Sequence, residues 1–242
     1  MTADTVIESP HNERLTLVRK LAQRKHRERE GLFLTEGEDL LEAGLAAGEE
    51  PALLLTAAGA GLGGTEVEPD LLASVSTLGS GTRAIAAWPI REHEVKGSVC
   101  AYLHAIRDPG NVGTIVRTAS ALVEGTVVLG PECADPHGPK AIRATMGAIF
   151  AQPLARAGIE ATPEPRVALV AHGGEPLNQL TAPLTICLGG EREGLPEAVL
   201  EHCERRVTIP LRDGAESLNV AASAAIALQR ISSPASVEGG DG

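Results

Sequence analysis

Three polar loops, far apart in the sequence, carry residue types that could bind a ligand and act on it. They are Asp108–Gly113 (D-P-G-N-V-G), Gly189–Gly194 (G-G-E-R-E-G) and the junction Ser217-Leu218-Asn219. The first and third lead into helical patterns, where unpaired backbone N–H groups can converge on a ligand. The second follows an apolar strand pattern. We predict that the three loops are walls of one site.

Each helix start carries a candidate capping residue. Ile209-Pro210 ends a strand, because proline cannot donate to a sheet ladder, and Ser217 is then predicted to cap the alanine-rich helix that follows. Asn111 is predicted to cap a helix over 111–123, with Arg117 within two turns of its start. In the second loop Glu191 could bind a ligand hydroxyl or amine, or simply hold the loop.

The glycines of these loops do not form the common phosphate-binding motifs. The chain has neither the G-x-G-x-x-G of dinucleotide sites at the first loop nor a G-x-x-x-x-G-K-[ST] sequence. A nicotinamide-dependent dehydrogenase is therefore disfavoured. A nucleotide-binding α/β enzyme that uses the glycine loops for phosphate ranks last among the functions considered.

Apolar runs bounded by turns predict the elements that position the loops. Strands are expected at 98–105, 126–129, 166–171, 184–188 and 207–209, with helices at 111–123, 139–149, 196–202 and 217–231. Such runs are typical of strands buried on both faces of a parallel sheet, and open α/β sheets bind ligands at the carboxyl edge of their strands. The fold class is therefore α/β.

The first ninety residues predict a smaller alternating α/β unit. After a frayed start (1–8), helices are expected at 9–30 and 37–47, with a helical turn at 70–73 and strands at 32–35, 52–56, 75 and 83–88. We predict an N-terminal domain over 1–90, a linker over 91–97, a catalytic domain over 98–231 and a disordered tail over 232–242.

The predicted first helix is strongly basic in an acidic chain. Residues 14–29 hold seven lysines and arginines against Glu28 alone, while the whole chain has a net charge of −11. A solvated helix face would explain this cluster, but its contrast with the rest of the chain favours an RNA-backbone contact. The candidate RNA-binding residues are Arg24, Lys25, Arg27 and Arg29.

Composition excludes other classes of protein. Aromatic residues make up only 2% of the chain, so small aliphatic residues must fill the core. The four cysteines show no metal-like spacing and are expected to be reduced, partly buried thiols of a cytoplasmic protein, with no bound metal. We expect neither a signal peptide nor a membrane span, because no apolar run is long enough.

The three loops in order, N-x-G-x-x-x-R, G-x-E-x-x-G-L and I-P-L-x-x-G-x-E-S-L-N-V-A, resemble the three motifs of the SpoU/TrmH family of RNA ribose 2′-O-methyltransferases in the SPOUT superfamily. The intervening stretches Asp135–Lys140 and Arg143–Gly147 also match the family's usual sequence, although His137 stands where tyrosine is common. The resemblance covers about residues 98–231 closely. The N-terminal domain resembles, more loosely, the family's ribosomal-protein-like substrate-binding domain.

The resemblance implies a deep trefoil knot in the second domain, S-adenosylmethionine as cofactor and a homodimer with each site near the subunit interface. It implies that Gly189, Ile209, Leu218 and Asn219 contact the cofactor, that Arg117 acts on the target ribose hydroxyl, and that Asn111, Glu191, Ser217 and Asn219 shape the catalytic pocket. It favours ribosomal RNA over transfer RNA as substrate. The alternative from another class is a catalytically silent RNA-binding protein that keeps the cofactor pocket.

Overall fold

The computed structural model describes residues 6–77 and 81–232, which belong to two compact units. Unit 1 is Met1–Arg91 with Asp135–Ala151, and unit 2 is Glu92–Ala134 with Gln152–Gly242. The segment Asp135–Ala151, which the sequence-based boundaries assign to the second domain, thus packs with the N-terminal residues. The predicted tail lies outside the described residues from 233 onward, whereas Ser232 ends a short strand.

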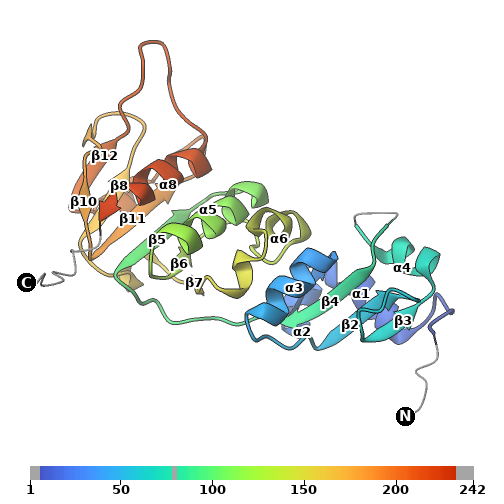
Figure 1. The fold of residues 1–242 in the computed structure, drawn as a ribbon. Coiled ribbons are helices and arrows are strands. Elements are labelled where there is room, and N and C mark those ends of the chain that lie inside the picture. The colour runs from blue at the N-terminus through green and yellow to red at the C-terminus, as the bar shows by residue number, and fades with distance from the viewer. Residues whose placement is uncertain (1–5, 78–80, 233–242) are drawn as a thin grey trace, which may run out of the picture. The chain divides into compact units, whose positions relative to one another are not determined.

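Unit 1 is a four-stranded sheet with helices on both faces (Figure 1). Its elements are α1 (Glu13–Leu21), α2 (Arg24–Glu30), β1 (Leu32–Glu36), α3 (Glu38–Ala46), β2 (Leu53–Ala57), β3 (Thr65–Val67), α4 (Pro69–Val75), β4 (Ala84–Pro89), α6 (Pro139–Thr145) and the 3₁₀ turn η1 (Ala148–Phe150). The strand order is β1-β4-β2-β3. Successive β4 residues alternate between the two apolar cores, with Ile85 facing α1 and α4 and Trp88 facing α3 and α6.

Three predictions for residues that belong to unit 1 are wrong in detail. Ile7 forms a bridge with Val67, so residues 6–8 are not frayed. Val75 ends helix α4 instead of forming a strand. The helix expected over 139–149 stops at Thr145, because Met146 and Gly147 both adopt left-handed backbone conformations.

The predicted basic helix over 9–30 is two helices. Asn12 caps α1 by accepting a hydrogen bond from the Arg14 N–H, and α1 ends at Leu21. The Arg27 guanidinium, on α2, donates to the carbonyls of Leu21 (2.7 Å) and Ala22 (2.9 Å). It thereby satisfies carbonyl groups that the end of α1 leaves without helical partners.

Arg27 also forms a buried ion pair with Asp135, the first residue of the returning segment. Their side chains are 5% and 13% exposed, and the Nη2–Oδ2 distance is 2.7 Å. Burial alone would raise the pKa of Asp135, but the hydrogen bond from Arg27, the N–H of His137 and the charge of Arg27 outweigh it, and the pKa is lowered. The pair fixes the segment 135–151 to α2.

Unit 2 is built on a seven-stranded parallel sheet of order β7-β6-β5-β11-β8-β12-β9 (Figure 1). Its elements are β5 (Val99–His104), α5 (Pro109–Leu122), β6 (Val127–Leu129), β7 (Leu154–Arg156), η2 (Ile159–Ala161), β8 (Arg166–Leu169), β9 (Glu175–Pro176), β10 (Leu180–Thr181), β11 (Leu184–Gly189), α7 (Glu197–Leu200), β12 (Arg205–Thr208), α8 (Val220–Gln229) and β13 (Ile231–Ser232). β10 and β13 form a separate parallel pair. The parallel α/β prediction is confirmed.

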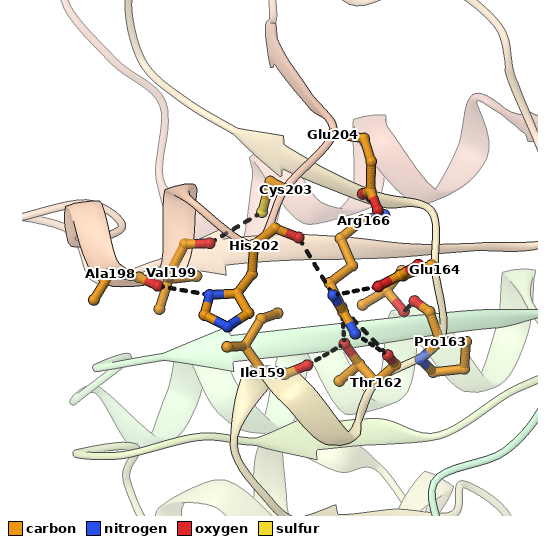
Figure 2. A network of polar contacts seen from close by, with 11 residues as sticks. Ile159, Thr162, Pro163, Glu164, Arg166, Ala198, Val199, His202, Cys203 and Glu204 are labelled. Atoms are coloured by element: carbon orange, nitrogen blue, oxygen red, sulfur yellow. Dashed lines mark hydrogen bonds and ion pairs between the residues drawn. The ribbon is translucent and has the colours of Figure 1, made fainter.

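A buried arginine fixes the beginning of β8. Figure 2 shows the Arg166 guanidinium surrounded by acceptors: it donates to the carbonyl of Thr162 (2.8 Å), to the Glu164 carboxylate (3.1 Å) and to the His202 carbonyl (3.4 Å). Glu204 accepts from the backbone N–H of Arg166. These contacts join the segment after η2, the start of β8 and the turn before β12.

The four cysteines are free thiols, three of them buried and Cys203 partly so. In the described ranges no helix is long and apolar enough to span a bilayer.

Asp135→Asn should destabilise unit 1 by about 3 kcal/mol, because it leaves the buried Arg27 charge without its partner. Trp88 is the single tryptophan, and its ring packs edge-on against that of Phe150 with 4.8 Å between the ring centroids. Its fluorescence during urea denaturation therefore reports the unfolding of unit 1. The pKa of Asp135 is lowered in the folded state, so its ion pair with Arg27 stabilises unit 1 fully above the ordinary carboxyl pKa of about 3.9. This stabilisation is lost as the pH falls through the folded-state pKa. The difference from wild type should therefore shrink in acid.

The matched control is Glu28→Gln, which breaks the exposed Arg24–Glu28 pair (51% and 57% exposed) and should cost at most about 1 kcal/mol. Equal effects of the two variants would contradict a structural role for the buried pair.

Candidate active site

The three predicted loops meet at the carboxyl edge of the unit 2 sheet. β5 and β11 are neighbours, with His104 opposite Gly189, so the loops that follow them begin side by side. A Cβ at Gly190 would lie 2.4 Å from the Ala105 carbonyl oxygen. Only glycine allows the first and second loops to approach this closely.

The N-cap of α5 is Asp108, and the prediction of Asn111 as the cap is wrong. The Asp108 carboxylate accepts from the N–H groups of Gly110 (2.7 Å) and Asn111 (3.1 Å). A carboxylate is well placed there, because the helix dipole puts partial positive charge at this end. The Asn111 side chain is consequently available for other contacts.

The N-cap of α8 is Asn219, and the prediction of Ser217 is likewise wrong. Asn219 Oδ1 accepts from the N–H groups of Ala221 (2.9 Å) and Ala222 (3.3 Å). The helix begins at Val220, two residues later than Ser217 would require, which leaves the Ser217 hydroxyl outside the helix.

One chain of side-chain hydrogen bonds joins the three loops. Asn219 Nδ2 donates to Asn111 Oδ1 at 3.1 Å, and Asn111 Nδ2 donates to Glu191 Oε1. Both amide orientations follow from this chain, since Asn219 Oδ1 is occupied by the helix start and Glu191 can only accept. Three residues predicted to act together are thus linked, with Asn111 bonded to both Asn219 and Glu191.

A cavity of about 390 Å³ opens beside this chain. Its lining comprises Leu169, Val170, Ala171, His172, Leu188, Gly189, Gly190, Glu191, Arg192, Glu193, Gly194, Leu195, Ile209, Leu211, Ser217, Leu218, Val220 and Ser223. It includes three of the four predicted cofactor contacts, Gly189, Ile209 and Leu218, together with Ser217 and Glu191, but not Asn219.

Sequence reasoning missed the wall formed by 169–172. This stretch follows β8, which lies next to β11 in the sheet, so its loop opens at the same edge. The predicted strand at 166–171 was the available signal, but its neighbours in the sheet could not be deduced from its sequence.

Arg117 does not line this cavity. It is exposed on α5, and it has no hydrogen bond or ion pair with any residue that the structure describes. Asn111 and Arg117 are six residues apart on one helix and therefore project in different directions.

An ion-pair cluster borders the cavity. Arg107, just before the α5 cap, pairs with Glu132 and lies 3.9 Å from Glu193 Oε1. The hydrogen bond from Arg107 lowers the pKa of Glu132. Glu193 lines the cavity and is 73% exposed.

The basic residues of unit 1 differ in their availability for RNA. Arg27 is buried against Asp135, so its predicted contact with RNA is replaced by a structural role. Arg24 pairs with Glu28, Arg29 pairs with Glu30, and both arginines stay on the surface. Exposed pairs of this kind are weak and can exchange partners.

The remaining predicted cation, Lys25, is exposed, with no ion pair or hydrogen bond among residues 6–77 and 81–232. Burial, and then the charges of Arg29, Lys25 and Lys20, lower the pKa of the neighbouring His26. These cations therefore act together as a locally positive surface on α1 and α2.

Replacing Asn219 should separate its two contacts. Asn219→Ala removes the helix cap and should lower the free energy of unfolding by about 1 kcal/mol. Asn219→Asp keeps an acceptor for the helix N–H groups but cannot donate to Asn111, so it should retain the stability of α8 while disconnecting the loops. Chemical denaturation checks the first effect, and equal destabilisation by both variants would contradict the capping role.

Comparisons with known proteins agree with this geometry. The SpoU rRNA Methylase family profile matches residues 98–229, and that of the MRM3-like substrate binding domain matches 12–80. The 23S rRNA (guanosine(2553)-2′-O)-methyltransferase RlmP of Bacillus subtilis is 29% identical over 91% of this chain and 96% of its own.

Solved structures give the same result. The AdoMet-bound rRNA methyltransferase of Sinorhizobium meliloti superposes with a TM-score of 0.80 at 28% identity, covering 93% of this chain and 96% of its own. The SpoU methyltransferase AviRb of Streptomyces viridochromogenes, in complex with AdoMet, superposes with a TM-score of 0.78 at 25% identity, covering 91% and 97%. With the family profile matching more than half of its length, the chain belongs to the SpoU rRNA Methylase family.

Proposed function

We propose that the protein transfers a methyl group from S-adenosylmethionine to a ribose 2′-hydroxyl of ribosomal RNA. The observation that carries this proposal is the hydrogen-bonded chain Glu191–Asn111–Asn219 beside the cavity, because it joins all three family motifs. A catalytically silent RNA-binding protein would not need this polar set, and nothing in the site favours that alternative.

The cavity residues fit S-adenosylmethionine. Its volume of about 390 Å³ lies in the range of small-molecule sites, and leucine, isoleucine and valine side chains can enclose the adenine ring. Gly189, Gly190 and Gly194 leave backbone groups accessible, and Glu191, Arg192 and Glu193 bring charged side chains to the lining that suit a charged ligand. Gly189, Ile209 and Leu218 are the residues that would hold it, with Asn219 fixing the helix start beside them.

The chemistry demands mainly alignment. The cofactor supplies an electrophilic methyl group when bound, whereas a ribose hydroxyl is a weak nucleophile that must be held in line and must lose a proton. Asn111, Glu191 and Asn219 fix the relative positions of the loops, and Ser217 offers a hydroxyl at the cavity wall. Arginine is too basic for an efficient general base, because its side chain stays protonated at neutral pH. Arg117 therefore stabilises the developing alkoxide or the adjacent phosphate.

A homodimer would complete this arrangement. Arg117 is exposed on α5 outside the cavity of its own subunit, and α5 and α8 also expose the apolar side chains of Leu122 and Ile226 (44% and 37%). Exposed apolar side chains on the two packed helices α5 and α8 suit a subunit interface, at which Arg117 would reach the site of the partner. The trefoil knot is likewise proposed from family membership, and a location in the cytoplasm from the ribosomal substrate.

Arg117→Ala should lower the rate at which labelled methyl groups are transferred to total RNA by at least about a hundred-fold, as for other lost electrostatic stabilisers. The Kd for S-adenosylmethionine should stay within two-fold of the wild-type value. Digestion of the RNA should place the label in 2′-O-methylated nucleosides. The control is Arg205→Ala, an exposed arginine paired with Glu175. Near-normal turnover of Arg117→Ala would refute the assigned role, and cofactor binding without transfer to any RNA would favour the silent binder.

Replacing Arg24, Lys25 and Arg29 together with glutamine should weaken RNA binding and flatten its salt dependence. Each lost phosphate contact removes roughly 0.7 from the slope of log K against log salt for single-stranded RNA. The control replaces Arg83 and Arg91, exposed unit 1 arginines paired with Glu38 and Glu49. A slope that stays at its wild-type value would show that these cations do not contact RNA and only form a solvated face of α1 and α2.

A further inference from the structure

The charged residues at the edge of the cavity point to selection between the cofactor and its product. S-adenosylmethionine carries a positive sulfonium, and methyl transfer leaves a neutral thioether in S-adenosylhomocysteine. The amino-acid carboxylate and ammonium are unchanged by the reaction. A site can therefore separate substrate from product through negative charge near the sulfur.

Two carboxylates line the cavity, and they differ in their hydrogen-bond and ion-pair partners. Glu191 accepts the hydrogen bond from Asn111 and belongs to the chain that joins the loops. Glu193 is 73% exposed, and its contact within the described residues is the 3.9 Å ion pair with Arg107. Glu193 is thus the carboxylate available to face a bound cation.

The neighbouring arginines determine how far the negative charge of Glu193 is neutralised. Arg107 pairs mainly with Glu132 and reaches Glu193 only at the longer distance. Glu132 therefore draws Arg107 away from Glu193 and leaves the Glu193 carboxylate partly uncompensated. Arg192, also in the lining, suits the cofactor carboxylate, which substrate and product share, so its charge does not separate them.

We propose that Glu193, with its charge tuned by Arg107 and Glu132, selects the sulfonium cofactor over the neutral product at the edge of this cavity. The inference rests on the proposed function, since it assumes that the cavity holds S-adenosylmethionine. It adds a specificity role that none of the three loop motifs requires. Its consequence is weaker inhibition by S-adenosylhomocysteine as product accumulates.

Calorimetric titration of the purified full-length protein with each ligand tests the proposal without relying on turnover. Glu193→Gln keeps the shape and removes the charge, and it should weaken S-adenosylmethionine binding by roughly two- to five-fold, as for exposed ion pairs, while leaving S-adenosylhomocysteine nearly unchanged. Arg107→Gln should shift the ratio of the two Kd values in the opposite direction. Both shifts should diminish in high salt, because exposed charges are screened.

The control is Glu124→Gln, an exposed carboxylate after α5 whose backbone carbonyl pairs at the start of β5, at the opposite edge of the sheet. It should leave the ratio unchanged. Equal weakening of both ligands by Glu193→Gln, or an unchanged ratio in both variants, would overturn charge selection while leaving the methyltransferase proposal intact. A shifted ratio without methyl transfer to any RNA would instead support the selection and refute the proposed function, and failure of the wild type to bind the cofactor would overturn both.

Discussion

The parallel pairing of β5 with β11 is the constraint on which the site depends. It brings two loops that are eighty residues apart in the sequence to one sheet edge, with His104 beside Gly189. The backbones then lie so close that Gly190 has no room for a Cβ against Ala105. Once the loops are this near, a single amide, that of Asn111, can bridge Glu191 on one side and Asn219 on the other. Close backbone approach and side-chain chemistry are therefore parts of one arrangement.

A second constraint governs the N-terminal unit. Arg27 is the residue around which α1, α2 and the segment 135–151 are held, because one guanidinium serves two helix-end carbonyls and the Asp135 carboxylate. Fixed donor geometry and permanent charge suit arginine to this task better than lysine. The family profile for the catalytic region spans 98–229, yet part of it completes the N-terminal core through Phe150 and Ile142. Substrate-binding and catalytic sequence are thus interlaced.

Sequence patterns predicted the long elements and the three loops, and they failed where tertiary contacts decide. Strands β5, β11 and β4 are largely apolar runs, so their composition alone predicts that they are buried. The two-residue strands β9, β10 and β13 exist only through their neighbours and carry no periodic signal. Ser217 and Asn219 are both good capping residues, and the choice between them follows from the bond of Asn219 to Asn111, which no local rule contains. Arg27 was indistinguishable from its basic neighbours for the same reason, since its partner is 108 residues away.

The distribution of charge reconciles an acidic chain with a polyanionic substrate. A net charge of −11 repels RNA as a whole, so affinity must come from a local surface. α1 and α2 gather cations, and burial, together with the charges of Arg29, Lys25 and Lys20, lowers the pKa of His26 there. The carboxylates gather elsewhere: Glu132, Glu191 and Glu193 lie at the edge of the cavity in unit 2. Negative charge that would hinder RNA binding is useful there, because the cofactor is a cation at its reacting atom. An enzyme that must hold a cation and a polyanion in one complex therefore gains from keeping the two signs of charge on different parts of its chain, which its net charge alone conceals.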